Sequence, residues 1–550
     1  MTRLWKPAGL LATGLALAKL SSLCAGNPAA GISSAGAAWI CLIAAIVAAC
    51  RARRRAVPLP ASAAWAGWTE AADLARGGAL LLGLWPSPRV PLPLYLDEEQ
   101  ASAHTLVLGP SRTGKTAGVI APNVLLRDPS RESIVVLDIK TGPRSLWNVT
   151  AGRYGARAHL FCPLFDGSIR YNPLHRAVTI GEAQRIAALL IRNTTPRDLS
   201  GDAQVYASAA ADLAALLFLH VQSARATGGH TVGSVYRLLL GGTGAVRAAL
   251  AGSPVSEVRQ LAGAFAARER RVREAAVTGL LQRLSPWADP IVDDATAGHW
   301  DLGRLGREPA ALYIVLPETD ASRLQPLVAW LVADLLDTLI EQADRGERRR
   351  PVRLFLDEFR RFGYLAGLSD RLPTLRERGV SVVLGAQVLS QIEEVYGVRD
   401  ARTLVANTET KLIFRAGDLE TARSVSAWLG DTTVPAVSRT VGPGGTRATV
   451  HPYVRPLAMP DDIARMPDGI VLALTGRRRP FVLRQARYFD PTVRALLPPA
   501  ADPPFALRSR ASREAVTAAG AAPAVRLPDP APRRSAPRPH GGVRVSPRAT

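Results

Sequence analysis

Short, uninterrupted apolar runs recur along the middle of the chain and alternate with stretches of helical periodicity. Glycine, proline and aspartate bound these runs, and continuous apolar runs of this length are typical of parallel strands that are buried on both faces. Six of them are predicted to be strands, at Thr105–Leu108, Ile134–Leu137, Leu312–Leu316, Leu354–Leu356, Val380–Leu384 and Lys411–Phe414. The pattern predicts a doubly wound α/β core.

Between about Arg176 and Leu302 the strand pattern gives way to helical periodicity. Gly181–Arg192 and Gln204–Gln222 are rich in Ala and Leu and repeat apolar residues at helical spacing. This stretch is therefore predicted to be an all-helical domain inserted into the α/β core.

Two apolar runs near the start of the chain, Ala8–Cys24 and Ile32–Cys50, each approach the roughly 20 residues that a helix needs to cross a bilayer. Basic residues precede the pair and Arg51–Arg55 follows it, so the positive-inside rule predicts a transmembrane hairpin with only Gly26–Ser34 outside. The first run also fits a cleaved signal peptide. Either interpretation leaves the bulk of the chain in the cytoplasm.

These patterns divide the chain into consecutive parts. The predicted boundaries are a transmembrane hairpin at 1–56, a connector and the start of the soluble domain at 57–100, the helical insertion at 176–302 and a disordered basic tail at 501–550. The two parts of the α/β core fall at 101–175 and 303–500, and the GxxxxGK[ST] pattern at Gly109–Thr116 predicts that they form a nucleotide-binding domain. The tail is assigned from its Pro, Ala and Arg content, which offers too few large apolar residues to offset the entropy of ordering.

Composition adds a strong positive charge to this picture. The 550 residues contain 68 Lys+Arg against 46 Asp+Glu, a net charge of +22, and the four cysteines do not have the spacing of a zinc site or a disulfide framework. Such a charge fits contact with a polyanion, whose binding would weaken steeply with salt. Charge next to a membrane in an arginine-biased chain is the competing explanation. Only five of the 68 cations are lysines, so each lysine is informative.

One lysine lies in a pattern that binds phosphate. The sequence Gly109, Pro110, Ser111, Arg112, Thr113, Gly114, Lys115, Thr116 matches GxxxxGK[ST] between a predicted strand and an apolar helix start. In this motif backbone N–H groups surround the phosphates, the lysine reaches the β- and γ-phosphates, and the hydroxyl of the last residue binds Mg²⁺. A Gly/Ser turn is the alternative, but a lysine in so arginine-rich a chain favours an ATP site.

Two further strand ends carry polar residues that suit ATP hydrolysis. Asp357 and Glu358 end one apolar run, where an aspartate can hold Mg²⁺ through water and a glutamate can deprotonate the attacking water. Gln387 ends the next run and could sense the γ-phosphate. An acidic pair at a strand end is by itself more typical of a turn or a helix cap. Because this pair follows a phosphate loop in the same chain, a catalytic role is favoured.

Taken together, the motifs resemble those of type IV coupling proteins, the TraG/TraD-type ATPases of conjugation and type IV secretion. The similarity runs from about residue 80 to about 495 and includes the phosphate loop, Val135–Gly142, Arg170–Leu174, Leu354–Gly363, Leu375–Gly397 and Leu419–Gly430. The resemblance implies a RecA-like P-loop ATPase core with an all-helical insertion, a membrane-anchored homohexamer, and ATP with Mg²⁺ as cofactors. It places the arginine finger on Arg376. One departure is Asp138–Gly142, which lacks the glutamate that usually ends this motif.

The resemblance implies an ATP-driven motor that couples single-stranded DNA, or a relaxase–DNA complex, to the components of a type IV secretion channel. An FtsK-like or HerA-like translocase is the runner-up, but the 242 residues between Lys115 and Asp357 leave room for the insertion that such enzymes usually lack. A coupling ATPase for protein effectors shares the same architecture. A membrane docking platform that binds nucleotide without turnover is the alternative from another class.

Overall fold

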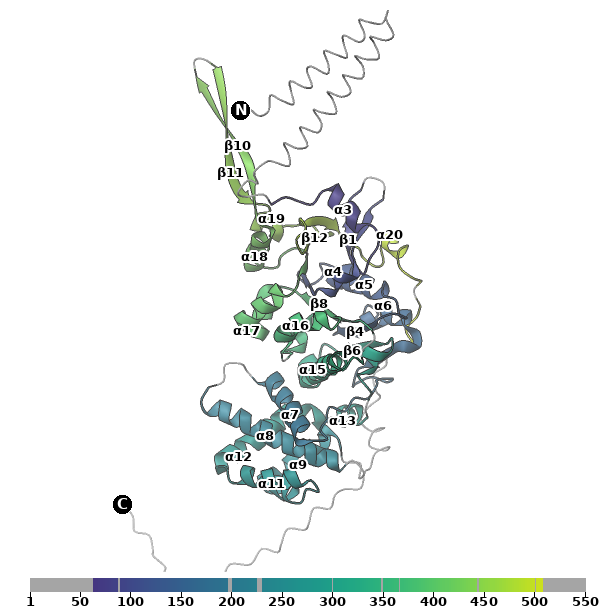
Figure 1. The fold of residues 1–550 in the computed structure, drawn as a ribbon, viewed down its shortest axis with the longest axis vertical. Helices are drawn as coiled ribbons and strands as arrows, with labels where there is room; N and C mark the ends of the chain where they lie inside the picture. The colour runs from purple at the N-terminus through teal and green to yellow at the C-terminus, as the bar shows by residue number, and fades with distance from the viewer. Residues whose placement is uncertain are drawn as a thin grey trace, which may run out of the picture. The chain divides into compact units, whose positions relative to one another are not determined.

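The computed structural model describes residues 63–507, except for residues 88–89, 196–199, 225–229, 299, 348–349, 366, 443–444 and 500 (Figure 1). The described residues form two compact units, one of residues 63–159 with 302–504 and the other of residues 160–301 with 505–507. The predicted transmembrane hairpin at 1–56 lies outside the described residues, as does the predicted tail from 508 onward.

The first unit is built on a large mixed sheet, whose eleven described strands run in the order β2-β1-β13-β12-β9-β3-β8-β7-β4-β6-β5. The six strands predicted from the apolar runs are confirmed and form its parallel centre. Nearly all of their residues are buried, which explains why they read as continuous apolar runs. These strands are β3 (Thr105–Leu108), β4 (Ser133–Asp138), β6 (Ala311–Val315), β7 (Val352–Leu356), β8 (Val380–Ala386) and β9 (Thr410–Ile413).

Antiparallel strands that the sequence analysis did not assign extend this centre. β12 pairs with β9, β13 with β12, β1 with β13 and β2 with β1, so the start and end of the unit meet in one half of the sheet. Their bounds, with those of the strand at the opposite edge, are β1 (Leu80–Trp85), β2 (Leu92–Leu96), β12 (Ile470–Thr475), β13 (Phe481–Arg484) and β5 (Ala158–Phe161).

Helices connect the strands of this unit. The longest is α15 (Ala321–Asp344), which buries Trp330 completely and packs against the short helix η6 (Phe359–Phe362). The others are α3 (Trp68–Leu74), α4 (Glu98–Ser102), η1 (Thr116–Ile120), α5 (Ala121–Leu125), α6 (Leu146–Thr150), η2 (Ala151–Arg153), η3 (Gly155–Arg157), α14 (Arg304–Arg307), α16 (Leu368–Glu377), α17 (Leu389–Ala406), α18 (Leu419–Leu429), α19 (Pro460–Ala464) and α20 (Pro491–Arg494).

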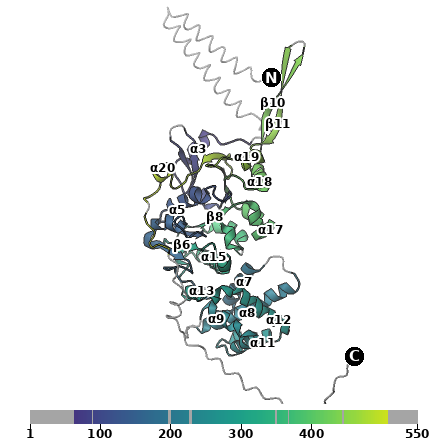
Figure 2. The same ribbon diagram turned by 180° about the vertical axis from the view of Figure 1, so that it is seen from behind.

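A two-stranded hairpin also belongs to the first unit. It consists of β10 (Asp431–Gly442) and β11 (Gly445–Pro456), which pair antiparallel along their whole length. Both views show it beside α18 and α19 (Figure 1, Figure 2). The N–H of Ala63 donates to the carbonyl of Asp431 over 3.0 Å, so the base of the hairpin is joined to the first described residue.

The second unit is helical. Between residues 176 and 302 the described part contains helices and no strand, and α8 packs against α7, α11 and α12. The helices are α7 (Ile180–Thr194), α8 (Asp202–Ser223), α9 (Val232–Leu240), α10 (Gly242–Ala251), α11 (Ser256–Ala266), α12 (Arg270–Arg283), η5 (Ser285–Ala288) and α13 (Pro290–Ala295). α8 is long and apolar enough to cross a bilayer, but 56% of its most apolar stretch is buried, as expected of a core helix.

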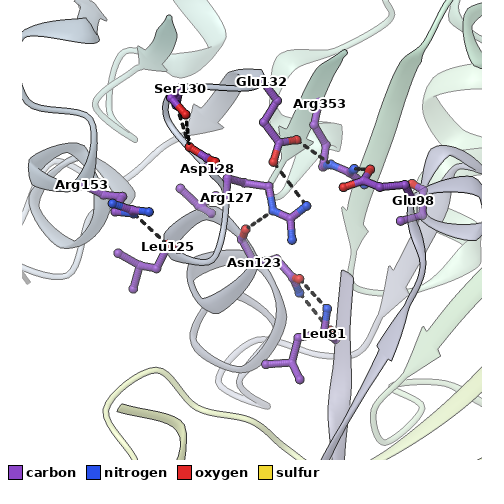
Figure 3. Close-up of polar contacts among 12 residues, drawn as sticks. Leu81, Glu98, Asn123, Leu125, Arg127, Asp128, Ser130, Glu132, Arg153 and Arg353 are labelled. Carbon is purple, nitrogen blue, oxygen red and sulfur yellow. Dashed lines mark hydrogen bonds and ion pairs between the residues drawn. The ribbon is translucent and has the colours of Figure 1, made fainter. Parts of the chain in front are cut away.

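A buried ionic cluster joins several elements of the first unit (Figure 3). Glu132 lies 3.4 Å from a guanidinium nitrogen of Arg127 and 3.7 Å from one of Arg353, and all three side chains are at most 8% exposed. Arg353 also donates to the carbonyl of Ala101 over 2.8 Å, and Asn123 bonds both backbone polar groups of Leu81. The cluster therefore ties β1, α4 and α5 to strand β7 by polar contacts.

Candidate ATP site

The predicted site residues that follow three strands converge at one edge of the sheet, where a fourth strand also ends. The loop Gly109–Thr116 follows β3, Asp357 and Glu358 follow β7, Gln387 follows β8, and Asp138 is the last residue of β4. β3 lies beside β8, β8 beside β7 and β7 beside β4, all parallel. Because parallel strands bring their carboxyl ends to the same edge, ligands of such sheets bind there.

The phosphate loop has the strained backbone that its motif requires. Gly114 has φ +100°, a conformation that favours glycine, and Arg112 has φ +67°, which is uncommon for a residue with a side chain. The Thr113 hydroxyl donates to the carbonyl of Pro110 over 2.8 Å, and the N–H of Gly118 donates to that of Gly114 over 2.6 Å. The loop thus leads directly into η1 and α5. The N–H groups of Gly109 and Thr113 donate to the carbonyls of Ala386 and Pro110, so an anion would be bound by N–H groups elsewhere in the loop.

Lys115 points back over this loop. Its side chain is only 4% exposed, and its Nζ donates to the carbonyls of Gly109 over 2.6 Å and Pro110 over 3.1 Å. Oε1 of Glu358 lies 3.5 Å from the same ammonium. The cation is therefore held at the centre of the loop, where it can exchange the two carbonyls for phosphate oxygens.

Thr116 and Asp357 form the pair that the sequence assigned to Mg²⁺. The Thr116 hydroxyl donates to Oδ2 of Asp357 over 2.5 Å, and Asp357 is 1% exposed. Oδ1 of Asp357 is buried and has no hydrogen-bond partner among the described residues, although a buried oxygen is normally satisfied. A hydroxyl and a carboxylate with a spare oxygen suit Mg²⁺, which prefers oxygen ligands and keeps several waters.

Glu358 is set at a sharp turn. Its backbone is left-handed, with φ +49° and ψ +43°, and the next residues form η6, whose Phe359 and Phe362 are completely buried. The anchored phenylalanines hold the turn in this conformation. Gln387 donates from Nε2 to Oε2 of Glu358 over 2.9 Å, so the two residues predicted to act on water touch each other.

The altered motif Asp138–Gly142 also reaches the site. Asp138 accepts from the N–H of Leu146 over 2.7 Å and from that of Lys140 over 3.1 Å. Burial, with the charge of Asp357 as a second cause, raises the pKa of Asp138 to about 6. Nζ of Lys140 lies 3.3 Å from Oγ1 of Thr116 and 3.5 Å from Oδ2 of Asp357. Lys140 therefore lies at the site, a position that the sequence analysis did not predict.

Sequence reasoning missed Gln485, which follows strand β13. Its Nε2 donates to the carbonyl of Thr113 over 2.9 Å, and its Oε1 accepts from Nε of Arg487 over 3.1 Å. A Cβ added to Gly114 would lie 2.7 Å from that Oε1, so the close approach requires glycine. Gln485 thus holds the phosphate loop by a hydrogen bond, which we call the clamp, although it lies more than 360 residues later in the sequence. No pattern in the sequence predicts this contact.

Arg376 does not join the other predicted site residues within one chain. It lies on α16, just before β8 begins, whereas Gln387 follows the end of that strand. The seven residues of β8 span roughly 23 Å at a strand's usual rise. Arg376 pairs with Glu409 over 3.0 Å, and both side chains are more than 40% exposed. It therefore lies at the edge of the sheet opposite its own phosphate loop.

Comparison with known families gives this site a context. Residues 90–521 match the family described as type IV secretory system conjugative DNA transfer. The chain belongs to this family. Among curated members, it is 25% identical over 407 residues to the protein VirD4 of Agrobacterium fabrum, covering 70% of this chain and 59% of that protein. It is 26% identical over 403 residues to the conjugal transfer protein TraG of Escherichia coli, covering 66% and 62%. The family member described here spans about three fifths of the length of these relatives.

Solved structures show the same fold. The plasmid coupling protein TrwB in complex with the ATP analogue ADPNP superposes with a TM-score of 0.62 at 20% identity, covering 82% of this chain and 98% of that one. TrwB in complex with ADP and Mg²⁺ superposes with a TM-score of 0.60. The mixed α/β architecture with a large, mainly parallel central sheet is thus shared with a nucleotide-binding coupling protein, which confirms the α/β part of the predicted fold class.

Proposed function

We propose that this family member is a membrane-anchored P-loop ATPase that couples DNA, or a DNA–protein complex, to a type IV secretion channel and drives its transfer. The observation that carries the proposal is the meeting of the phosphate loop, Asp357, Glu358 and Gln387 at one sheet edge. Membership of a conjugative DNA transfer family supports the substrate class. The nucleotide complexes of TrwB support ATP and Mg²⁺ as cofactors.

In this proposal each site residue has one task. The N–H groups of Gly109–Thr116 and the ammonium of Lys115 bind the β- and γ-phosphates. Thr116 and Asp357 would hold Mg²⁺, which supplies positive charge against the phosphate oxygens. Glu358 takes a proton from the attacking water, and its hydrogen bond to Gln387 keeps its carboxylate in place.

Arg376 completes the site of a neighbouring subunit. Its position at the amino end of β8, away from its own phosphate loop, supports a role in trans rather than in cis. A guanidinium supplied by a neighbour stabilises charge that develops on the γ-phosphate. We therefore propose a ring of identical subunits, a homohexamer, as the active form.

The anchor and the cargo are further parts of the proposal. Residues 1–56 would place the protein in the inner membrane as a helical hairpin, with the nucleotide-binding core and the helical insertion at 176–302 in the cytoplasm. The net charge of +22 supports contact with nucleic acid. Single-stranded DNA, a relaxase–DNA complex and the channel components would be its partners.

The test is ATP turnover by the full chain, purified in lipid nanodiscs, with and without single-stranded DNA. Lys115→Ala should abolish nucleotide binding, whereas Glu358→Gln should keep binding and stop hydrolysis, because only the proton acceptor is lost. Lys411→Ala is the matched control, since Lys411 contacts Thr408 and the ring of Trp428 instead of the phosphate loop. Hydrolysis by Glu358→Gln at the unmodified rate would refute the assignment of the base. If ATP turnover rises with an effector protein but never with DNA, the proposed DNA cargo is wrong and a protein effector is the cargo.

A further inference from the structure

Lys140 has no task in the mechanism above, yet it lies against both residues assigned to Mg²⁺. Its Nζ is 3.3 Å from Oγ1 of Thr116 and 3.5 Å from Oδ2 of Asp357. Its backbone N–H is held by Asp138. Lys140 is one of only five lysines among 68 cationic residues, so a flexible ammonium was kept at this position where the chain otherwise uses arginine.

The charges around Lys140 explain why a cation belongs there. Asp138 and Asp357 are each 1% exposed, and Glu358 lies beside them at 15%. All three carboxylates act on the ammonium of Lys140, and Asp357 lies 3.5 Å from it. Lys115 faces Glu358, which leaves Lys140 as the cation that faces Asp357.

The two lysines differ in how firmly they are held. Lys115 is 4% exposed and donates at hydrogen-bond distance to two backbone carbonyls. Lys140 is 44% exposed, and its two contacts are at the long end of the hydrogen-bond range. Its four-carbon stem can therefore carry the ammonium away from Thr116 and Asp357 without disturbing the fold.

We propose that Lys140 is a movable counter-cation that competes with Mg²⁺ for Thr116 and Asp357 and that turns to the phosphates when nucleotide binds. The inference rests on the proposed ATP site. A Mg²⁺ ion held by Thr116 and Asp357 would place a second positive charge next to the ammonium that lies 3.3 Å from the Thr116 hydroxyl oxygen, and the two cations would repel each other. Mg²⁺ then binds only as Lys140 leaves, and the phosphates of a bound nucleotide would offer the ammonium an anion in place of Asp357.

This role predicts two changes of opposite sign in Lys140→Met, which keeps an unbranched side chain and removes the charge. The Mg²⁺ concentration that half-saturates Mg²⁺-dependent ADP binding should fall about tenfold, because the competing charged hydrogen bonds are gone. In EDTA, the affinity for ADP should also fall about tenfold, because no ammonium then neutralises its phosphates. A residue that only supports the fold would weaken binding in both conditions.

The experiment measures binding of a fluorescent ADP analogue to the full chain, with MgCl₂ titrated in one series and EDTA present in the other. Lys411→Met is the control and should superpose on the unmodified chain in both series. The thermal midpoint of each variant reports whether it is folded. If Lys140→Met is not folded, Lys140→Gln is used in its place.

The outcomes separate this inference from the proposed function. If the unmodified chain binds no ADP at saturating Mg²⁺, the proposed ATP site itself is wrong. If the unmodified chain binds ADP, two results would show that the counter-cation role is wrong while the ATP site stands. In one, Lys140→Met binds as the unmodified chain does in both MgCl₂ and EDTA; in the other, it binds more weakly in both. Opposite shifts in the two series support the role.

Discussion

Replacing Arg376 by alanine tests whether the ATP site is shared between subunits. Within one chain Arg376 lies roughly 23 Å from the strand end that carries Gln387, too far for its side chain to reach its own phosphate loop. We therefore expect Arg376→Ala to bind ATP as the unmodified chain does. Turnover in the assembled ring should fall by about 10³ to 10⁵, the usual contribution of an arginine supplied from outside the site.

The contact that Arg376 makes within its own subunit is too weak to oppose this role. The ion pair with Glu409 is 42% and 46% exposed, and such pairs contribute about 0 to 1 kcal/mol. Breaking this ion pair so that Arg376 can reach a neighbouring subunit therefore lowers the equilibrium constant for the shared site by at most about fivefold. Glu409→Gln serves as the matched control, because it breaks the same ion pair but leaves the guanidinium in place, and its turnover should change by no more than that factor.

Mixed rings provide the decisive assay. Arg376→Ala and Glu358→Gln are each expected to be inactive alone, but a mixture contains interfaces with one intact Arg376 facing one intact Glu358. ATP turnover should therefore reappear when the two variants are assembled together. Normal turnover by pure Arg376→Ala rings would refute the reasoning, and Arg378, two residues further on, would then be the candidate.

Two further predictions concern the core that supports the site. Glu132→Ala leaves the buried guanidinium of Arg127 without its carboxylate and that of Arg353 with only the exposed Glu98. It should lower the free energy of unfolding by about 3 kcal/mol, whereas Glu318→Gln, at an exposed ion pair, should lower it by about 0 to 1 kcal/mol; equal losses in denaturant titrations would contradict the cluster's role. His104 accepts from the N–H of Val382 and contacts the carbonyl of Leu372, and burial lowers its pKa. Below the ordinary histidine pKa the unfolded chain takes up a proton that the folded chain resists, so stability should fall as the pH drops through about 6.5. His104→Gln should flatten this slope in thermal midpoints measured between about pH 7 and pH 5, and an unchanged slope would assign it to other groups.

The central strands could be predicted because a strand that is buried on both faces consists almost entirely of apolar residues, and such a run is visible in the sequence. β4 and β8 are continuous apolar runs, and helices follow them, so their parallel arrangement is implied. The outer half of the sheet was not predicted for a different physical reason. β1 pairs with β13, about 400 residues later in the chain, and such a pairing is fixed by packing between distant segments that no local pattern records.

The same distinction applies to the site. Gly109–Thr116 is contiguous, so its chemistry is visible as a motif, and Asp357 and Glu358 were found because they end an apolar run. Gln485 is a single polar residue after a short strand, and only the antiparallel pairing of β13 brings it to Thr113. The contact of Lys140 with Thr116 depends on how the loop after β4 turns, which spacing alone does not determine.

The clamp of Gln485 on the phosphate loop has a consequence for synthesis of the protein on the ribosome. The loop begins at Gly109, 376 residues before its clamp, which at typical rates of about 5 to 20 residues per second is a delay of about 20 to 75 s. Glu358 and Gln387 follow within that interval, but throughout it a nascent chain carries the complete motif without the contact from Gln485. A ligand stabilises the state that binds it, so chains that already include Gln485 are expected to gain more protection from nucleotide than shorter products, which lack this contact.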